Sequence, residues 1–540
     1  MLSGCVSWPP DLASRYRHDG YWRGVPLGSI ARDVAGTDPE RVAIVTDDAS
    51  MTYGELDARA DQVAAGMRRL GISGSDRVVV QLPSVPEFAV VCLALFRLGA
   101  LPVLAIPAYR RDEIQYLCEV TSAVAYVIPH RWQGFDYLPL AREVRQSAPS
   151  LRHVLVAGDA TEFTPLAHVA EPAIALPPID TSDVAFFLLS GGTGGRPKLI
   201  PRTHDDYMYQ LRATAEALRF DRHGVYLAAL PIAHNAALGC PGVLGTLLAG
   251  AKLALAASPS PADVFPLVER EGVTLTTLIS PLVALWVQAA ALFGVRFPQL
   301  LLQVGGARLD PVVGRKIRSH LGCSLTNWFG MAEGLLCHTR LDDPDDVILS
   351  TQGHPLSPAD ELRVVDDMGR DVAAGEVGEL LVRGPYTLRG YYNSPQYNDT
   401  AFTADGHLRT GDLVRRTSAG HLVVEGRIKD VINRGGEKIA PEELEQHLAE
   451  HPGVREAAVV SIPDPLLGER TCAFVVPRHR RVELDDVRSF LSARGLADYK
   501  LPDRLECTDA FPKTTLGKVD KGGLRDLAAL GTTSQRGAVA

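Results

Sequence analysis

Residues 190–204, SGGTGGRPKLIPRTH, combine residue types that bind phosphate. Glycine backbone N–H groups, the hydroxyls of Ser190 and Thr193, and the ammonium of Lys198 can all donate to phosphate oxygens. The stretch is not a Walker loop, G-x-x-x-x-G-K-[ST], because a proline precedes the lysine and a leucine follows it. Taken alone, the pattern fits a phosphate-binding loop and a flexible glycine-rich surface loop equally well.

Three further motifs follow in order along the chain. NWFGMAEG (327–334) places Glu333 in a glycine-bounded turn, where a carboxylate would suit a hard dication. LRTGDL (408–413) places Asp412 after a β-rich segment, and PKTTLGKVDK (512–521) places Lys518 near the end of the chain. Each residue alone would ordinarily be a solvated surface charge, so the ordered set carries more information than any one motif.

The four motifs, in this order and spacing, resemble the adenylate-forming (ANL) superfamily over roughly residues 25–527. The stretches LPIAHNAALGCPGVLGTLLAG, QVGGARL, FGMAEGLL and VRGPYTLRGYY are most similar to its stand-alone aryl-acid AMP ligases, which take salicylate or 2,3-dihydroxybenzoate. The resemblance implies that ATP, with Mg²⁺, activates an aryl acid to aryl-AMP. It also implies transfer to the phosphopantetheine thiol of an aryl carrier protein, in the nonribosomal peptide synthesis of a siderophore or antibiotic.

The resemblance assigns a role to each motif. Attack of a carboxylate on the α-phosphate joins two anions, so positive charge and donors are needed where charge builds up. In the family, Lys198 binds the β- and γ-phosphates, Glu333 is the metal-linked residue, and Lys518 bridges the α-phosphate and the carboxylate. Gly194 stands where a second threonine is usual, so one hydroxyl ligand is missing. With His234 completing the catalytic set, the implied ATP site is Ser190, Gly191, Gly192, Thr193, Gly195, Gly305, Gly306, Ala307, Asp412 (ribose) and Arg427.

The implied aryl pocket centres on HNAALGC (234–240). In the subgroup the asparagine bonds the hydroxyl ortho to the carboxylate, and members that take 2,3-dihydroxybenzoate tend to have serine where Cys240 stands. Cysteine is a weak donor, so a hydroxyl at ring carbon 3 would be poorly paired, which is costly. This predicts salicylate over 2,3-dihydroxybenzoate, although a packed core thiol is the ordinary interpretation of Cys240. The full expected pocket is His234, Asn235, Ala236, Cys240, Gly306, Gly330 and Cys337.

Two pocket positions depart from the subgroup. Ala236 stands where tyrosine or phenylalanine is usual, and Cys337 where valine or leucine is common. Both changes shorten a side chain and should widen the cavity. A substituted salicylate such as 6-methylsalicylate, 3-hydroxypicolinate or an anthranilate therefore stays open as the acid.

Alternating strands and helices must position these motifs. Residues 52–72 have helical periodicity, and short apolar runs between helical patterns predict strands at 185–190, 226–231, 252–257, 274–280 and 300–306. The alternation predicts an α/β fold, with a large N-terminal part of helix-covered mixed sheets. The 190–198 loop follows directly on a strand, where such sheets bind ligands.

After about residue 355 the pattern changes to strands joined by turns, which predicts a small β-barrel-like subdomain. A small, mobile α+β C-terminal domain follows. Lys429 occupies the family's hinge position, and Gly436 would lie beside the pantetheine tunnel, although residues 426–436 could be a simple linker. The expected domains are an N-terminal adenylation domain 1–427 (β-rich over about 355–427), a hinge 428–430, a C-terminal lid 431–527 and a disordered tail 528–540.

Composition narrows the class of protein. The formal net charge of -9 over 540 residues disfavours non-specific nucleic-acid binding, which needs a basic face. The sequence has neither an apolar run of membrane-spanning length nor a signal-peptide pattern, so no membrane partner is expected. Eight cysteines without a C-x-x-C pair suit reduced thiols in the cytoplasm.

Two rival functions remain. A CoA ligase of the same fold would need a basic patch for the CoA phosphate, and Arg478, Arg480 and Arg481 are a weak candidate beside the simpler view of a solvated loop. A non-catalytic binding protein would be expected to lose some of the motif residues, which are all present here.

Overall fold

The computed structural model describes residues 2–190, 197–306, 309, 311–434, 437–464, 467–479, 481–494, 496, 498–514 and 517–536. The described chain forms two compact units. The first unit extends to residue 362 and includes residues 382–408, and the second comprises residues 363–381 and the chain from residue 409.

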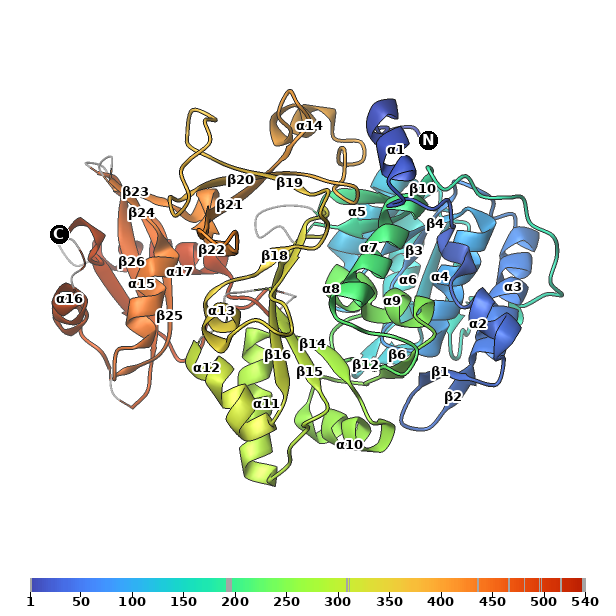
Figure 1. Ribbon diagram of the computed structural model, residues 1–540, viewed down its shortest axis with the longest axis horizontal. Coiled ribbons are helices and arrows are strands. Elements are labelled where there is room, and N and C mark those ends of the chain that lie inside the picture. Colours follow the sequence, from blue (N-terminus) through green and yellow to red (C-terminus); the bar gives the residue numbers. More distant parts are fainter. Residues whose placement is uncertain are drawn as a thin grey trace. The chain divides into compact units, whose positions relative to one another are not determined.

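The first unit is built on two mixed sheets whose strands are mostly parallel (Figure 1). The first sheet has the order β18 (His354–Pro355), β17 (Leu336–His338), β16 (Ser324–Gly330), β15 (Leu301–Gly305), β14 (Leu275–Ile279), β12 (Val225–Ala228), β13 (Lys252–Leu255), β1 (Val42–Val45), β2 (Ser50–Thr52). The second has the order β11 (Leu199–Thr203), β10 (Val184–Leu189), β4 (Leu101–Leu104), β3 (Arg77–Val80), β5 (Ala125–Pro129), β8 (His153–Ala157), β9 (Thr164–Pro165).

Helices of the first unit form layers around these sheets. Helix α3 (Tyr53–Arg69) packs on β1 and on α4 (Pro86–Leu98), which packs on β4. Helix α9 (Gly242–Leu248) likewise packs on β12 and on α7 (His204–Ala217), which packs on β11. Each helix pair therefore connects one sheet to the other. The other faces are covered by α5 (Arg111–Thr121), α6 (Tyr137–Ser147), α10 (Pro261–Glu271) and α11 (Ser280–Phe293).

The remaining elements of the first unit are short apart from the N-terminal helix. They are α1 (Pro10–His18), α2 (Arg32–Thr37), α8 (Asn235–Gly239), α12 (Pro311–Lys316), α13 (Asp345–Ser350), α14 (Pro395–Ala401), β6 (Arg131–Trp132) and β7 (Phe135–Asp136).

An aromatic cluster joins the N-terminal segment to the body of the first unit. Trp22, packed edge-on against Trp8 with ring centroids 4.9 Å apart, shares this cluster with Trp328. The pocket residues Ala236 and Cys240 belong to the same buried cluster. The segment before residue 31 therefore helps to enclose the expected pocket.

The second unit contains two smaller sheets. The β-rich segment expected after residue 355 is a sheet of order β19 (Glu361–Val365), β20 (Gly378–Arg383), β21 (Leu408–Arg416), β22 (Leu422–Arg427), most of whose residues lie in this unit. The other sheet has the order β24 (Glu437–Ile439), β23 (Ile432–Arg434), β26 (Gly468–Pro477), β25 (Val454–Asp464), with β27 (Arg504–Cys507) paired to β26. Its helices are α15 (Pro441–Ala449), α16 (Leu484–Ala493) and α17 (Lys521–Arg536).

The predicted fold class is confirmed: helix-covered mixed sheets form the large N-terminal part, and a smaller α+β part follows. The compact units do not divide at residue 427, because the structure groups β21 and β22 with the C-terminal sheet. A hinge at 428–430, where a short 3₁₀ turn lies, stays a prediction. Helix α17 continues to Arg536, into the stretch expected to be a tail. In the described part of the chain, no helix combines the length and apolarity needed to cross a bilayer.

Candidate active site

Strand pairing and two hydrogen bonds hold the two ends of the expected phosphate loop together. Strands β10 and β11 pair antiparallel, with Leu189 opposite Leu199. The Ser190 amide donates to the Lys198 carbonyl over 2.9 Å, and the Lys198 amide donates to Ser190 Oγ over 3.0 Å. Ser190 Oγ accepts this bond, so its own hydrogen can still be donated to another group. The other expected loop residues, Gly191, Gly192, Thr193, Gly194 and Gly195, lie outside the described residues.

Two tyrosines hold the charged groups beside this loop. The Lys198 ammonium lies 3.9 Å from the Tyr397 ring centroid and 5.7 Å from that of Tyr391. The Tyr391 hydroxyl donates to Glu333 Oε1 over 3.0 Å. Tyr391 thus links the two residues expected to bind the polyphosphate and the metal.

The expected metal residue fits a site completed by phosphate. Among the described residues, no group of three or more His, Cys, Asp or Glu side chains could hold a metal ion. Magnesium is usually held by one or two carboxylates together with substrate phosphates. A single carboxylate, Glu333, on a turn next to the phosphate-loop lysine, matches that mode of binding.

The expected pocket residues gather at the start of α8. His234 is the N-cap of this helix, and its Nδ1 accepts from the Ala236 amide over 3.3 Å, which leaves Nε2 to carry the hydrogen. Asn235, Ala236 and Cys240 are buried. Burial raises the pKa of the Cys240 thiol to about 12, so the thiol is neutral. Cys337, on β17, is also fully buried.

Glycines predicted in the ATP site or the aryl pocket also have a packing reason. A Cβ added at Gly305 would lie 2.3 Å from Trp328 Nε1, and one at Gly330 would lie 2.6 Å from the same ring. Gly306 has φ +80°, a left-handed conformation that favours glycine. The close approach of Trp328 therefore accounts for two of these three glycines without a ligand. Ala307 lies outside the described residues.

The second unit brings four expected residues together. Asp412 is 3% exposed, and its Oδ1 is 2.8 Å from Arg427 Nε. Burial raises the pKa of Asp412, while Arg427, Lys518 and Lys429 oppose that rise. Although the Lys518 side chain is exposed, the surrounding protein desolvates its ammonium and Arg427 repels it, so its pKa is lowered. Three cations around one carboxylate make a site suited to a nucleotide.

A hairpin places Lys518 in this cluster. Lys513 bridges to Val519, the Thr514 amide donates to the Lys518 carbonyl over 2.8 Å, and the Lys518 amide donates to Thr514 Oγ1 over 3.2 Å. These bonds fix the backbone of a lysine that the sequence alone places only near the end of the chain. Gly436 lies outside the described residues.

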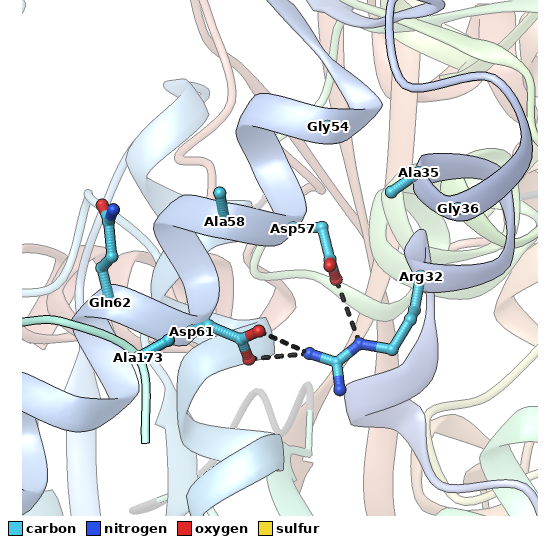
Figure 2. Close-up of a pocket in the computed structure, with 9 residues that line it drawn as sticks. All are labelled: Arg32, Ala35, Gly36, Gly54, Asp57, Ala58, Asp61, Gln62 and Ala173. Carbon is cyan, nitrogen blue, oxygen red and sulfur yellow. Dashed lines mark hydrogen bonds and ion pairs between the residues drawn. The ribbon is translucent and has the colours of Figure 1, made fainter. Parts of the chain in front are cut away.

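The cavity in Figure 2, of about 430 Å³, contains none of these expected residues. Arg32 projects into it and pairs with Asp61 at 2.7 Å and Asp57 at 3.3 Å. Arg97 pairs with the same two carboxylates. The charges satisfy one another, so the cavity is a structural ion cluster and carries no functional assignment.

Comparison with known proteins decides the family. The AMP-binding enzyme family matches residues 31–392, and the AMP-binding enzyme C-terminal domain matches residues 443–518. The chain belongs to the AMP-binding enzyme family. The predicted membership of the adenylate-forming superfamily is thereby confirmed, and with it the prediction that the protein is an enzyme.

Relatives place this family member among the aryl-acid AMP ligases. The chain is 52% identical to 2,3-dihydroxybenzoate-AMP ligase of Bacillus subtilis, over 97% of this chain and 98% of the relative. It is 48% identical to salicylyl-CoA synthase / salicylate adenylyltransferase of a Streptomyces species, over 97% of each. It is 45% identical to salicyl-AMP ligase / salicyl-S-ArCP synthetase of Mycobacterium tuberculosis, over 96% and 94%. The enzyme is an aryl-acid AMP ligase, as its motifs indicate.

Several residues in contact with this ligase's expected site were missed from the sequence. Arg202 is fully buried and donates to the Ala332 carbonyl, next to Glu333, over 3.1 Å. Tyr391 lies in VRGPYTLRGYY, which carried the family resemblance, and Tyr397 follows that stretch, but neither tyrosine was given a role. The one sequence signal for Arg202 is its position four residues after Lys198, in the same stretch as the expected phosphate loop.

Proposed function

We propose that the enzyme activates salicylate or a substituted salicylate with ATP and Mg²⁺ and transfers the acyl group to the phosphopantetheine thiol of an aryl carrier protein. The observation that carries the choice of acid is the pairing of Asn235 with Cys240, both buried, the latter as a neutral thiol. An amide beside a weakly polar thiol suits a ring with one polar group at the ortho position and a plain edge at carbon 3.

The proposed chemistry uses charge from both units. In the first unit, Lys198 would bind the leaving phosphates, and Glu333, with phosphate oxygens, would hold Mg²⁺, which offsets the charge of the polyphosphate. In the second, Asp412 would bind the ribose hydroxyls, and Lys518 would stabilise the charge that develops between the carboxylate and the α-phosphate. His234 would donate from Nε2 to the aryl carboxylate and hold it for attack.

The experiment is ATP–pyrophosphate exchange over a panel of acids. We expect kcat/KM to be higher for salicylate than for 2,3-dihydroxybenzoate, and benzoate to fall below both because Asn235 would then be buried without its partner. A preference for 2,3-dihydroxybenzoate, the acid in the name of the Bacillus subtilis relative, would contradict the proposed acid and leave aryl-acid activation intact.

The acceptor needs a separate measurement. The name of the Mycobacterium tuberculosis relative includes transfer to a carrier protein, and that of the Streptomyces relative includes CoA, so free CoA is the second candidate. We expect salicyl transfer to a holo aryl carrier protein to exceed transfer to CoA at equal concentrations. The reverse order would identify a CoA ligase. All eight cysteines are free, which suits the cytoplasm, where we propose the enzyme acts.

A further inference from the structure

Helix α7 presents a buried polar face to the expected pocket. Arg202 precedes the helix, and Tyr207 and Gln210 lie on it three residues apart, so both project to the same side. All three side chains are fully buried. Buried polar groups are hydrogen-bonded, so the partners of these three side chains show which of their atoms donate and which accept.

Arg202 fixes the direction of the hydrogen bonds because a guanidinium can only donate. Its Nε donates to Asp206 Oδ1 over 2.9 Å, and its Nη2 donates to Gln210 Oε1 over 2.9 Å. The Gln210 side-chain oxygen must therefore face Arg202. The amide NH₂ of Gln210 must face the other way.

The NH₂ group of Gln210 points toward the residues of the expected pocket. Its Nε2 donates to the Gly239 carbonyl over 3.0 Å, a group that can only accept, and lies 3.5 Å from Asn235 Oδ1. The Tyr207 hydroxyl donates to the same Asn235 oxygen over 2.9 Å. Because Gln210 Nε2 can only donate, the Asn235 atom that it meets must be the oxygen, and this fixes the Asn235 amide too.

The amide nitrogen of Asn235 is left for a ligand. In the described part of the chain its recorded partner is the Cys240 sulfur at 3.9 Å, which is a weak acceptor. Asn235 therefore presents N–H, and not C=O, to whatever lies against it.

We propose that Arg202, Gln210 and Tyr207 are positioning residues that hold Asn235 as a donor, and that the enzyme therefore selects acids whose ortho group accepts a hydrogen bond. This rests on the proposed function. In salicylate the phenolic hydrogen is bonded to the neighbouring carboxylate, so the oxygen presents lone pairs outward. In anthranilate the amino group donates one hydrogen to the carboxylate and directs the other outward. That N–H would then face the N–H of Asn235, and two donors cannot form a hydrogen bond with each other. Of the acids that the sequence leaves open, the donor orientation of Asn235 therefore favours the ortho-hydroxy acids as substrates over the anthranilates.

The test compares salicylate with anthranilate in ATP–pyrophosphate exchange. Tyr207→Phe removes one donor to Asn235 and keeps the ring, which packs on Phe186 with centroids 4.7 Å apart. Gln210→Met removes the other donor at similar length. Thr214→Val is the matched control: it removes a buried hydroxyl that bonds the Gln210 backbone carbonyl over 2.8 Å and leaves the Gln210 amide in place.

We expect the wild-type enzyme to prefer salicylate by at least about tenfold in kcat/KM, because opposed buried donors cost more than one lost hydrogen bond. Tyr207→Phe and Gln210→Met should each narrow this ratio about threefold to tenfold, mainly through KM for the acid, with KM for ATP unchanged. Thr214→Val should keep the wild-type ratio. If Gln210→Met does not fold, Tyr207→Phe alone decides.

Four results would overturn the inference. A wild-type enzyme that uses both acids equally well, or a Tyr207→Phe ratio equal to the wild-type ratio, would reject the positioning role while salicylate activation stands. Equal narrowing by Thr214→Val would show a general packing effect. A wild-type enzyme that exchanges with neither acid would reject the proposed function and this inference together.

Discussion

The charged residues of the site are held by partners that lie outside the motifs. Tyr397 and Tyr391 hold the Lys198 ammonium, and Arg427 pairs with Asp412. Lys198 and Asp412 therefore each have a partner within the protein. Binding of ATP would exchange these contacts for contacts with phosphate and ribose.

The strongest prediction for a single residue concerns Lys518. Lys518→Ala should lower salicylate-dependent pyrophosphate exchange about 10²–10³-fold, because the variant loses a cation at the point where charge develops. Transfer from supplied salicyl-AMP to the carrier protein should largely survive. Lys513→Ala, in the same hairpin, is the control and should retain exchange. Near wild-type exchange by Lys518→Ala would remove it from the catalytic set.

A second prediction at this scale concerns Cys240. Both Gln210 Nε2, at 3.8 Å, and Asn235 Nδ2, at 3.9 Å, approach its sulfur. A serine hydroxyl would be a stronger partner for a second ring hydroxyl, so Cys240→Ser should narrow the preference for salicylate over 2,3-dihydroxybenzoate by about tenfold. Exchange kinetics with the two acids measure this, and an unchanged ratio would show that Cys240 is only a packed thiol.

At the scale of elements, local signals were reliable. The helix expected over residues 52–72 is α3, which begins with a capping box between Thr52 and Glu55. Strands expected at 252–257 and 274–280 are β13 and β14. Periodicity and capping depend on residues that are close together in the sequence, so the sequence alone can predict them.

Pairings between distant elements could not be predicted in the same way. Strand β12 lies between β13 and β14 in the first sheet, and helix α7 packs on β11 of the second sheet. The sequence HDDYMYQLRATAEA shows a helix, but it does not show that Gln210 will meet Asn235 on α8. The sequence therefore suggests which residues line the expected pocket but does not show which side chains hydrogen-bond to them.

A prediction at this scale concerns the loop before β19. The Asp360 carboxyl group is enclosed by the protein, with Oδ1 buried, and its Oδ2 accepts from Tyr386 Oη over 2.7 Å and from the Ser357 amide over 3.1 Å. Burial raises the pKa of Asp360 from 3.8 to about 7. The folded protein thus binds a proton that the unfolded chain releases between these values, and stability falls as pH rises from about 4 to 7.

Asp360→Asn mimics the protonated carboxyl and should remove this pH dependence. The difference in unfolding free energy between the variant and the wild type should shift by as much as about 4 kcal/mol between pH 4 and pH 8, in favour of the variant at the higher pH. Urea unfolding at both pH values measures it. A difference that does not change with pH would contradict the buried, neutral state of Asp360.

At the scale of the molecule, the two units divide the site residues between them. Lys198, Glu333 and the pocket belong to the first unit, and Asp412, Arg427 and Lys518 to the second. We propose that adenylation and thiol transfer both use the first unit, and that the hinge proposed at Lys429 lets the second unit present different groups in each step.

Lys429→Pro tests this hinge. Proline fixes φ, so the variant should slow one half-reaction at least about tenfold more than the other, whereas Lys429→Ala should keep both. Pyrophosphate exchange and single-turnover transfer from salicyl-AMP report the two steps separately. Equal slowing of both steps would place the moving joint elsewhere.

The aromatic cluster behind the pocket has an optical consequence. The chain has five tryptophans, and Trp22 and Trp328 share a buried cluster with Ala236 and Cys240, with Trp8 packed against it. Much of the intrinsic fluorescence therefore originates beside the proposed aryl site. Because an aryl acid bound there would lie beside these indole rings, its arrival should change this emission, so the unlabelled enzyme carries its own reporter of occupancy.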